Sequence, residues 1–500
     1  MNRSVIPISM WAWPDVRSGR AVVRALDVAA CLAIAVVCLL AVRLPSVLSP
    51  VAAGPLGRWI RRAPTLAALT AMATGVVVCV VPWSGGPAGL VLRGAAGYLA
   101  LGVFRGAAIA AQETPAAFAA IQARAETGLV ERWFYRRLEH PIDAFFLGIA
   151  GSAAVMGVIP AILVIAVPAF TWMGLGFIWI AGVVLNTRHY TMLHVNSHNP
   201  IFRLSRASRA RSATDRAIVA AVAWFHEYIV NPTIDVMPEF VRAMHIYNHH
   251  VEQNSLDDVT TTLPYDRASL FSFCRLAVRR GLLVGCPVVL VHYLVRRGRR
   301  RELTRLVRGA VFFYAGVAAL WFAHPALGNF LLAAVFVRGV AIGGPNAITE
   351  HPFVDLAEPL NPYRNAMLVV EDDTDHGWYG EWLHAEHHAR PGRHWAAVAA
   401  AGRAELPRYR AEGAIGMRAF RRRAFLQALW TQRFERLSEY VLWIGPRELS
   451  RDQVAAILES RTRAVGGRRP DVGSRRRRLD LALGAAVAWL VTEDSADPAG

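Results

Sequence analysis

Nine of the 16 histidines in this 500-residue sequence fall into short clusters whose spacing suits metal binding. Three clusters read HVNSH, HIYNHH and HAEHH, and one more histidine stands in EHPFVD. Imidazole is a neutral ligand near pH 7 and suits iron, zinc, copper and nickel. Nine imidazoles are too many for one ion, so the pattern predicts two ions with four or five nitrogens each. The predicted ligands are His194, His198, His245, His249, His250, His351, His384, His387 and His388.

The spacing within each cluster has a simple helical explanation, because residues three or four apart share one face of a helix. His194 and His198 can point to one ion, and so can the three histidines of HAEHH. We expect His245 to pair with His249, which leaves His250 one step round the helix and able to reach a second ion. A catalytic zinc normally takes three protein ligands. A pair of redox metals therefore fits this number of imidazoles better than zinc.

The remaining histidines and the cysteines are expected to be structural. The five cysteines form no CxxC pair, which argues against a disulfide framework, a zinc ribbon or a redox dithiol. The sequence also has no HPGG haem motif and no strand–GxGxxG–helix signature. Electrons for redox chemistry must then come from a separate protein. The histidines outside the clusters are interpreted as ordinary surface or core residues: His140, His189, His226, His292, His324, His376 and His394.

Membrane helices are the elements expected to position these clusters, because 54% of the residues are hydrophobic and the mean hydropathy is +0.30. Residues 87–111 are apolar too, but Arg93 and Arg105 favour an interfacial position or packing against protein. The sequence predicts an all-α integral membrane protein with about six crossings arranged as helix hairpins. The predicted spans are 28–42, 66–83, two helices within 144–185 divided at Pro168, 309–323 and 326–343.

The charge of the chain is strongly positive, with a formal net charge of +18 and arginine at every one of the 55 basic positions. Arginine clusters beside apolar runs set membrane orientation and attract anionic lipid head groups. Because the clusters flank membrane segments, nucleic acid is not an expected partner. The positive-inside rule places every histidine cluster in the cytoplasm. We therefore expect a cytosolic helical cap carrying the dimetal site, at the cytoplasmic face of a bacterial plasma membrane.

The clusters, taken together, resemble the three histidine boxes of membrane-bound fatty acid desaturases and related hydroxylases, HX(3–4)H, HX(2–3)HH and HX(2–3)HH. The last box of that family often reads GExxHxxHH, which is similar to GEWLHAEHH in this sequence. The family also places a lone histidine about thirty residues earlier, which His351 resembles. The resemblance covers roughly 130–400. It suggests an N-terminal region with a membrane hairpin (1–130), a desaturase-like catalytic domain (131–400) and an Arg-rich C-terminal cytosolic extension (401–500).

The resemblance implies two iron ions, O2 as co-substrate, and attack on an unactivated C–H bond of a long lipid chain. A fatty acyl desaturase, which removes two neighbouring hydrogens, is the leading expectation. A hydroxylase of a fatty acid, alkane or carotenoid is the alternative. A membrane metal transporter or sensor is an alternative of another class, but it predicts ionisable residues midway through the spans, where this sequence has few. The implied partners are a lipid or acyl-chain substrate, the membrane, and an external electron donor such as a ferredoxin or a reductase.

Side chains near the boxes are expected to orient the imidazole rings by accepting their second N–H. In the family, an asparagine before the lone histidine contacts metal through water, and Asn346 is the nearest match. The acidic candidates for the orienting role are Asp257, Asp258, Asp355, Glu381 and Glu386.

Overall fold

The structure is a computed structural model, and it describes residues 20–44, 48, 54–83, 85–111, 128–371, 382–419, 421–466 and 474–491. The chain forms two compact units, and each unit is built from segments that are not consecutive in the sequence. Unit 1 comprises Met1–Arg43, Arg242–Glu302 and Phe336–Gly500, and unit 2 comprises Leu44–Val241 and Leu303–Val335.

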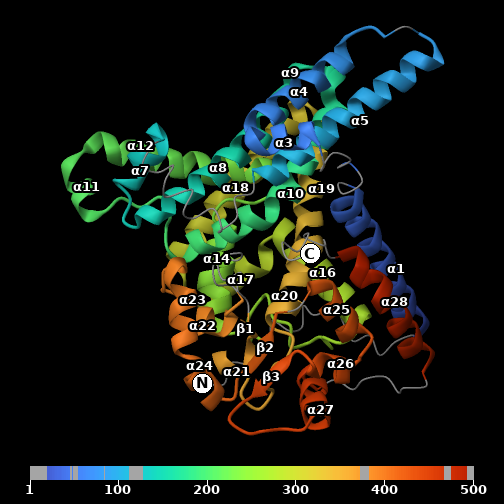
Figure 1. Cartoon of the computed structure of the whole chain (residues 1–500), viewed down its shortest axis with the longest axis vertical. Coiled ribbons are helices and arrows are strands. Elements are labelled where there is room, and N and C mark those ends of the chain that lie inside the picture. Colours follow the sequence, from blue (N-terminus) through green and yellow to red (C-terminus); the bar gives the residue numbers. More distant parts are fainter. Residues whose placement is uncertain are drawn as a thin grey trace. The chain divides into compact units, whose positions relative to one another are not determined.

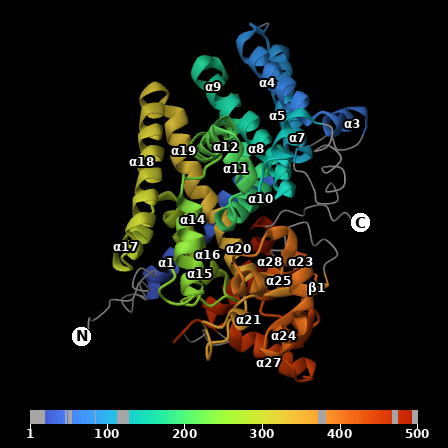
Figure 2. The same ribbon diagram turned by 90° about the vertical axis from the view of Figure 1, so that its left-hand side faces the viewer.

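The regular elements in the described part of unit 2 are helices, as Figure 1 shows, and they include most of the long apolar helices. Its helices α4 and α5 lie side by side as a hairpin (Figure 2). The helices of this unit are α3 (Pro55–Arg62), α4 (Pro64–Val80), α5 (Pro87–Ala110), α7 (Leu129–Tyr135), η4 (Pro141–Phe145), α8 (Phe146–Ala153), η5 (Ala154–Val158), α9 (Ile159–Ala166), η6 (Pro168–Phe170), α10 (Thr171–His198), α11 (Arg206–Arg211), α12 (Ala213–Phe225), η7 (His226–Val230), α13 (Asn231–Thr233), α18 (Arg300–Ala323) and α19 (Pro325–Arg338).

Five described helices are long and apolar enough to cross a bilayer, and α3 with α4 would make a sixth across a bend of 113°. This confirms a largely helical integral membrane protein with about six crossings. The predicted break at Pro168 is also confirmed, because Val167 leaves the helical conformation (φ −131°, ψ 87°) as a residue before proline tends to do. The five are Pro87–Ala110, Pro141–Ala166, Pro168–Leu185, Arg300–Ala323 and Pro325–Glu350.

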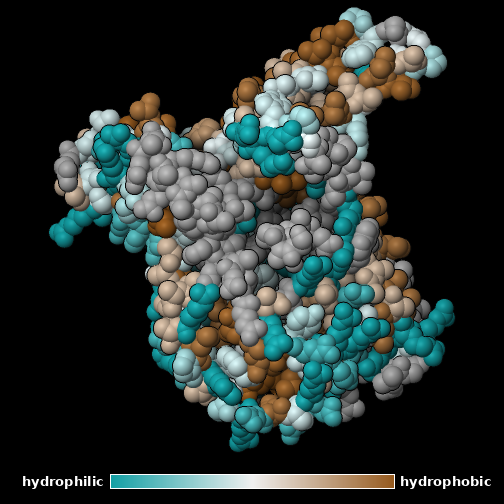
Figure 3. All heavy atoms as spheres, viewed as in Figure 1, coloured by the Kyte–Doolittle hydropathy of each residue, from teal (hydrophilic) through white to brown (hydrophobic). Residues whose placement is uncertain are grey.

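Residues 87–111 are predicted to be interfacial or packed against protein; helix α5 has the length and composition of a span, which corrects the interfacial alternative, and it also packs against α4 and α10. Both of its arginines lie near its ends. Arg93 donates to the Cys79 carbonyl (3.0 Å) near the C-terminal end of α4, and Arg105 is buried against protein. A long cationic side chain near a helix end can reach out of the apolar layer or pair within the protein. The α4–α5 hairpin accordingly carries apolar side chains on its surface (Figure 3), including Leu90 and Val91.

The predicted first span, 28–42, is not among the candidate spans of the described residues. Helix α1 (Arg20–Cys38) continues as the π-helix η2 (Leu39–Arg43), and its apolar helix Ala29–Cys38 is shorter than a span. Helix α1 packs instead in unit 1, where buried Asp27 pairs with Arg476 (2.7 Å) and Arg275 (3.5 Å).

Unit 1 combines short helices with a small sheet that the sequence analysis did not predict. Strand β1 (Leu368–Glu371) pairs parallel with β2 (Ile415–Arg418), which pairs antiparallel with β3 (Val441–Ile444). The other helices of the unit are α14 (Phe240–Met244), η8 (His245–His249), α15 (His250–Glu252), α16 (Leu270–Gly285), α17 (Val288–Arg296), η9 (Gly339–Gly343), α20 (Gly344–Glu350), α21 (Pro362–Asn365), α22 (His384–Ala389), α23 (Trp395–Ala404), α24 (Leu406–Ala411), α25 (Arg422–Trp430), α26 (Phe434–Ser438), α27 (Arg451–Arg461) and α28 (Arg475–Val491).

The C-terminal helices are part of the core of unit 1. Helices α25 and α28 pack against α1 and α16, and the Trp430 ring lies 4.5 Å from the Phe273 ring. Fully buried Arg267 donates to the Pro352 carbonyl (3.1 Å), beside His351, and to the Arg461 carbonyl (2.7 Å) at the end of α27. The division of function at residue 400 stays a prediction, but the chain after 400 packs with the segment that carries the lone histidine.

Candidate metal centre

Seven of the nine predicted ligands lie together in unit 1, where they form two neighbouring groups. They come from three segments. The π-helix η8 and helix α15 carry HIYNHH, the end of α20 leads into EHPFVD, and helix α22 carries HAEHH.

The first group, which we call the three-histidine group, consists of His245, His250 and His387. Their Nε2 atoms form a triangle with sides of 3.0 Å (His250–His245), 3.0 Å (His250–His387) and 3.2 Å (His245–His387). Hydrogen bonds cannot satisfy all three sides, because one imidazole nitrogen cannot both donate and accept. A cation between the three lone pairs would satisfy all of them. An ion about 2.1 Å from each nitrogen would see them at angles of about 90–100°, so the group fits a metal ion.

A π-helix explains why His245 is grouped with His250, which corrects the expected pairing of His245 with His249. The backbone N–H of His250 donates to the His245 carbonyl, five residues earlier. This i→i+5 pattern widens the helical turn and brings residues five apart onto one face. His249 therefore points to the other group. HAEHH is also divided, because His387 belongs to the three-histidine group, whereas His384 and His388 belong to the second.

The second group, the four-histidine group, consists of His249, His351, His384 and His388. The Nε2 atom of His384 lies 3.2 Å from the Nε2 atoms of both His351 and His388, and one ring nitrogen of each residue lies within 4.8 Å of the others. All four side chains are buried. Four imidazole nitrogens facing one point are again a suitable donor set for a transition metal.

The two groups lie next to each other. The ring centroids of His250 and His388 are 4.8 Å apart, and those of His384 and His387 are 5.4 Å apart. The seven rings therefore form one site with two metal positions. The sequence predicts two ions with four or five nitrogens each; these groups supply three and four, and the assignment of all nine histidines as ligands stays a prediction.

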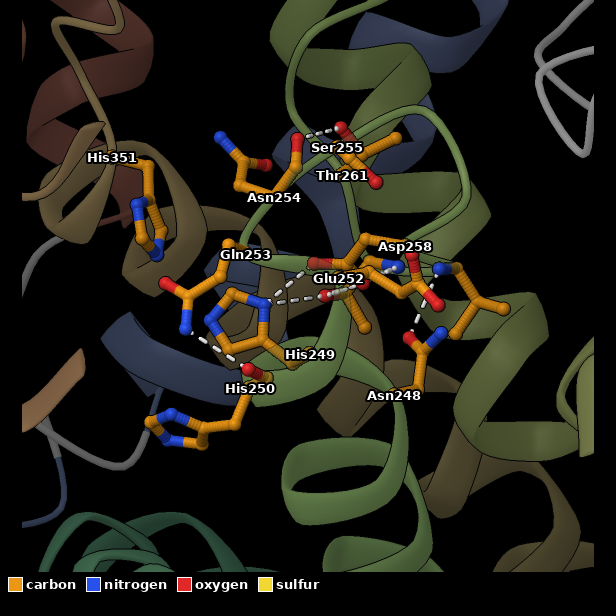
Figure 4. A network of polar contacts seen from close by, with 12 residues as sticks. Asn248, His249, His250, Glu252, Gln253, Asn254, Ser255, Asp258, Thr261 and His351 are labelled. Carbon is orange, nitrogen blue, oxygen red and sulfur yellow. Dashed lines mark hydrogen bonds and ion pairs between the residues drawn. The ribbon is translucent and has the colours of Figure 1, made fainter. Parts of the chain in front are cut away.

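In three rings of the four-histidine group, Nδ1 lies within hydrogen-bond distance of an acceptor oxygen, which leaves Nε2 for a metal. The Nδ1 atom of His249 lies 2.6 Å from Asp258 Oδ2, and that of His351 lies 2.7 Å from the Asn365 carbonyl oxygen. The Nδ1 atom of His388 lies 3.0 Å from an amide oxygen, Gln253 Oε1. Figure 4 shows Gln253 and Asp258 beside the labelled histidines of this network.

The surroundings of these residues favour the charged form of the Asp258 carboxylate and the neutral forms of the His351 and His388 rings. Burial alone would raise the pKa of Asp258, but the His249 ring and two hydrogen bonds from Thr260 hold it at about 2. Burial lowers the pKa of His351 to about 3 and lowers the pKa of His388 well below its usual value. Neutral imidazole is the form that binds metal, so these rings are ready to bind at neutral pH.

The other predicted orienting side chains have different partners in the structure. Asp257 pairs with Arg297 (3.2 Å), and Asp355 pairs with Arg461 (3.0 Å). Neither carboxylate holds an imidazole ring among the described residues. Their positions in sequence are as favourable as that of Asp258, but their side chains point to arginines.

Glu386 is fully buried on α22 yet also faces away from the imidazoles. Its carboxylate accepts a hydrogen bond from the Tyr409 hydroxyl and pairs with Arg393 and Arg390, so it attaches α22 to α24. Glu381 lies outside the described residues. Asn346 is half-buried on α20, five residues before His351, and its predicted role through water stays a prediction.

The HVNSH box lies in unit 2, at the C-terminal end of α10. The rings of His194 and His198 are 5.3 Å apart on one side of the helix, as the i,i+4 spacing predicts. Their role as ligands stays a prediction. Elsewhere in unit 2, His189 and His226 are buried and bonded to each other through Nε2 (3.1 Å), which agrees with a structural role for both.

Sequence reasoning missed Gln253 and Asn365. Gln253 is the third residue after HIYNHH and has a left-handed conformation (φ 51°), and Asn365 contributes a backbone carbonyl. Neither an amide side chain nor a carbonyl group has a sequence signal for a ring-orienting role. Only proximity to HIYNHH could have suggested Gln253.

Fold and site together define an integral membrane protein with imidazoles arranged for two metal ions. A family model described as fatty acid desaturase matches residues 170–421, about half of the chain, and the chain belongs to that family. The match contains all nine box histidines and ends before α25. No curated protein and no solved structure matches the chain.

Proposed function

We propose that the protein is an O2-dependent fatty acyl desaturase that inserts a double bond into a long alkyl chain, using two iron ions and an external electron donor. The observation that carries the proposal is the pair of adjacent imidazole groups in unit 1, in a chain of the fatty acid desaturase family. Two bound irons supply the activation of O2 that the removal of hydrogen from an unactivated C–H bond requires.

The residues of the chain would bind the irons and limit access of water to them. His245, His250 and His387 hold one position, and the four-histidine group holds the other. Burial lowers the pKa of His351 and of His388, because protonation would place a charge where water is excluded, and so keeps these two rings neutral. The Asp258 carboxylate, which is fully buried, increases the basicity of His249 as a ligand.

His194 and His198 complete the proposed ligand set. Their support is the box spacing, their common side of α10 and the family match, which includes them. Asn346 is proposed to act through water. The proposed ligand set then comprises all nine box histidines.

The proposed substrate is a lipid or acyl chain, and the proposed electron donor is a ferredoxin or a reductase. We place the metal centre at the cytoplasmic face of a bacterial plasma membrane, on the distribution of arginines. These assignments make the protein an enzyme of fatty acid metabolism.

Product analysis by mass spectrometry tests the reaction. The purified protein is reconstituted with iron, a reductase system, O2 and a fatty acyl substrate, and the product mass is compared with that of the substrate. Loss of two hydrogens is expected for a desaturase. Gain of one oxygen would instead establish the alternative, a hydroxylase of a fatty acid, alkane or carotenoid. Metal binding with neither product would contradict both and favour a metal transporter or sensor.

Metal analysis tests the site. About two irons per chain are expected in the detergent-purified protein. His387→Ala should lower iron content and abolish turnover, because His387 supplies one corner of the nitrogen triangle. His292→Ala is the matched control, since His292 is an exposed histidine on α17 of the same unit. Full iron content and turnover in the His387 variant would reject the site.

A further inference from the structure

Gln253 contacts one histidine of each group, His250 and His388, and has an unusual backbone conformation. It follows α15 with φ 51°, and Asn254 follows it with φ 61°. Two successive left-handed residues with side chains are unfavourable unless the surroundings hold them in place. The Gln253 N–H donates to the His249 carbonyl (2.7 Å), and the buried Asn254 side chain accepts from the Thr262 N–H (2.8 Å).

The Gln253 side chain joins the second and third histidine boxes. Its Nε2 donates to the His250 carbonyl (2.9 Å), and its Oε1 lies 3.0 Å from Nδ1 of His388. The first of these contacts can be followed in Figure 4.

The backbone of Gln253 joins the same assembly to the lone histidine. Its carbonyl accepts from Nδ2 of Asn365 (3.0 Å), which is fully buried and also donates to the Pro359 carbonyl (2.8 Å). The carbonyl of Asn365 in turn accepts from Nδ1 of His351 (2.7 Å). Three ligand-bearing segments that are far apart in sequence therefore meet at one glutamine.

These contacts determine the tautomer of His388. A carbonyl oxygen can only accept, so the His250 carbonyl requires the NH2 end of the Gln253 amide. The oxygen end then faces His388, whose Nδ1 must carry the hydrogen. In a neutral ring this leaves the lone pair on Nε2, the atom that faces the Nε2 of His384 at 3.2 Å.

We propose that Gln253 is a positioning residue that fixes the metal-binding tautomer of His388, and that metal affinity at the four-histidine group depends on it. The proposal rests on the proposed function only in requiring two metal positions. It assigns to one amide side chain a role that neither the histidine boxes nor the family match describes.

The test titrates the metal-free, full-length protein in detergent with Co²⁺ and follows visible absorption, which reports imidazole coordination separately from activity. Gln253→Met keeps the size of the side chain but removes both polar ends. We expect one of the two Co²⁺ sites to bind about 10–100-fold more weakly and the other to be unchanged. Unchanged affinity at both sites would overturn the proposal.

Gln432→Met is the matched control. Gln432 is also a left-handed glutamine (φ 56°) in unit 1, with Nε2 3.3 Å from the Ala268 carbonyl and Oε1 2.6 Å from Arg477. The Gln432→Met variant should bind both Co²⁺ ions with the affinities of the wild type. An equal loss in this variant would show that the effect is general destabilisation and would overturn the proposal.

Gln253→Glu provides a rescue and keeps the proposal testable if the methionine variant does not fold. Its carboxylate retains an acceptor for Nδ1 of His388 but has no donor for the His250 carbonyl, so the four-histidine group should bind its ion within about tenfold of the wild type. A loss of about 100-fold at that group, as large as for a lost orienting group, would contradict the assigned role. Failure of the wild type to bind two Co²⁺ ions would refute the proposed function itself, which is a distinct result.

Discussion

Replacing Asp258 by asparagine is a sharp test of how the four-histidine group is built, because both oxygens of the carboxylate have hydrogen-bond partners. Oδ2 lies 2.6 Å from His249 Nδ1, and Oδ1 accepts from Thr260 N–H (2.7 Å) and Oγ1–H (2.6 Å). An asparagine of the same shape has one oxygen and one NH2 group. If the oxygen faces Thr260, the NH2 group faces His249 and selects the tautomer whose Nε2 carries hydrogen. If the oxygen faces His249, two donors of Thr260 meet an NH2 group.

The expected magnitude follows from the lost orientation of the His249 ring. Burial alone would raise the pKa of Asp258, but the His249 ring and the Thr260 hydrogen bonds lower it to about 2, so the site stabilises the charged carboxylate. Loss of a group that orients a metal ligand typically costs 10–100-fold in metal affinity, or about 1.4–2.7 kcal/mol. We therefore expect a decrease of about 10–100-fold in metal affinity at one position.

The assay is a Co²⁺ or Fe²⁺ titration of the metal-free protein in competition with a chelator. Asp257→Asn is the control, because Asp257 is the adjacent acid but is partly exposed and pairs with Arg297 (3.2 Å). Exposed pairs contribute at most about 1 kcal/mol, and this one does not touch a ring. Wild-type affinity at both positions in Asp258→Asn, or equal losses in the two variants, would refute the reasoning.

Three further predictions concern stability, each measured by thermal unfolding in detergent. Burial lowers the pKa of His226 from 6.5 to about 4, so the unfolded state binds the proton more tightly than the folded state. The contribution of His226 to the free energy of unfolding is complete above pH 6.5 and falls by about 2 kcal/mol between pH 7 and pH 5. His226→Gln should remove this part of the pH dependence, and an unchanged pH profile in the variant would contradict the assignment. Arg267→Met should destabilise the protein by at least about 3 kcal/mol and lower its iron content, because it removes a buried guanidinium that donates to five carbonyls. A variant as stable as the wild type would show that those hydrogen bonds contribute little. Gly309→Ala should lower the free energy of unfolding by about 1–3 kcal/mol, because the added Cβ would lie 2.2 Å from the Pro238 carbonyl oxygen. Gly316→Ala in the same helix α18 adds a Cβ in open space and should leave stability nearly unchanged. Equal effects of the two substitutions would refute the packing argument.

The membrane class of the protein could be predicted from composition, because a bilayer core imposes length and hydropathy on any helix that crosses it. Which segments cross the membrane was harder to predict. The two arginines of α5 indicated that it is not a span, although both lie near its ends. Residues 28–42 were predicted as a span, but this stretch is not among the candidate spans. Hydropathy reports how apolar a segment is, but it does not report whether lipid or protein covers it.

The choice among acids near the boxes depended on tertiary structure. Asp257 and Asp258 are neighbours in sequence, yet one is partly exposed beside Arg297 and the other is fully buried behind His249. Glu386 stands between two predicted ligands and still points to Tyr409. A side chain's partner is decided by the segments that pack around it, and those segments come from distant parts of the chain.

The sequence by itself determined the number of imidazoles, their three boxes and hence the expectation of two metal ions, because the type and spacing of ligand residues are local properties. Only the tertiary structure decided which imidazoles share a metal position. A single π-helical turn groups His245 with His250 and turns His249 towards His351, which lies about a hundred residues further along the chain. The width of that turn is a property of the folded backbone, and the spacing of the histidines is compatible with either grouping.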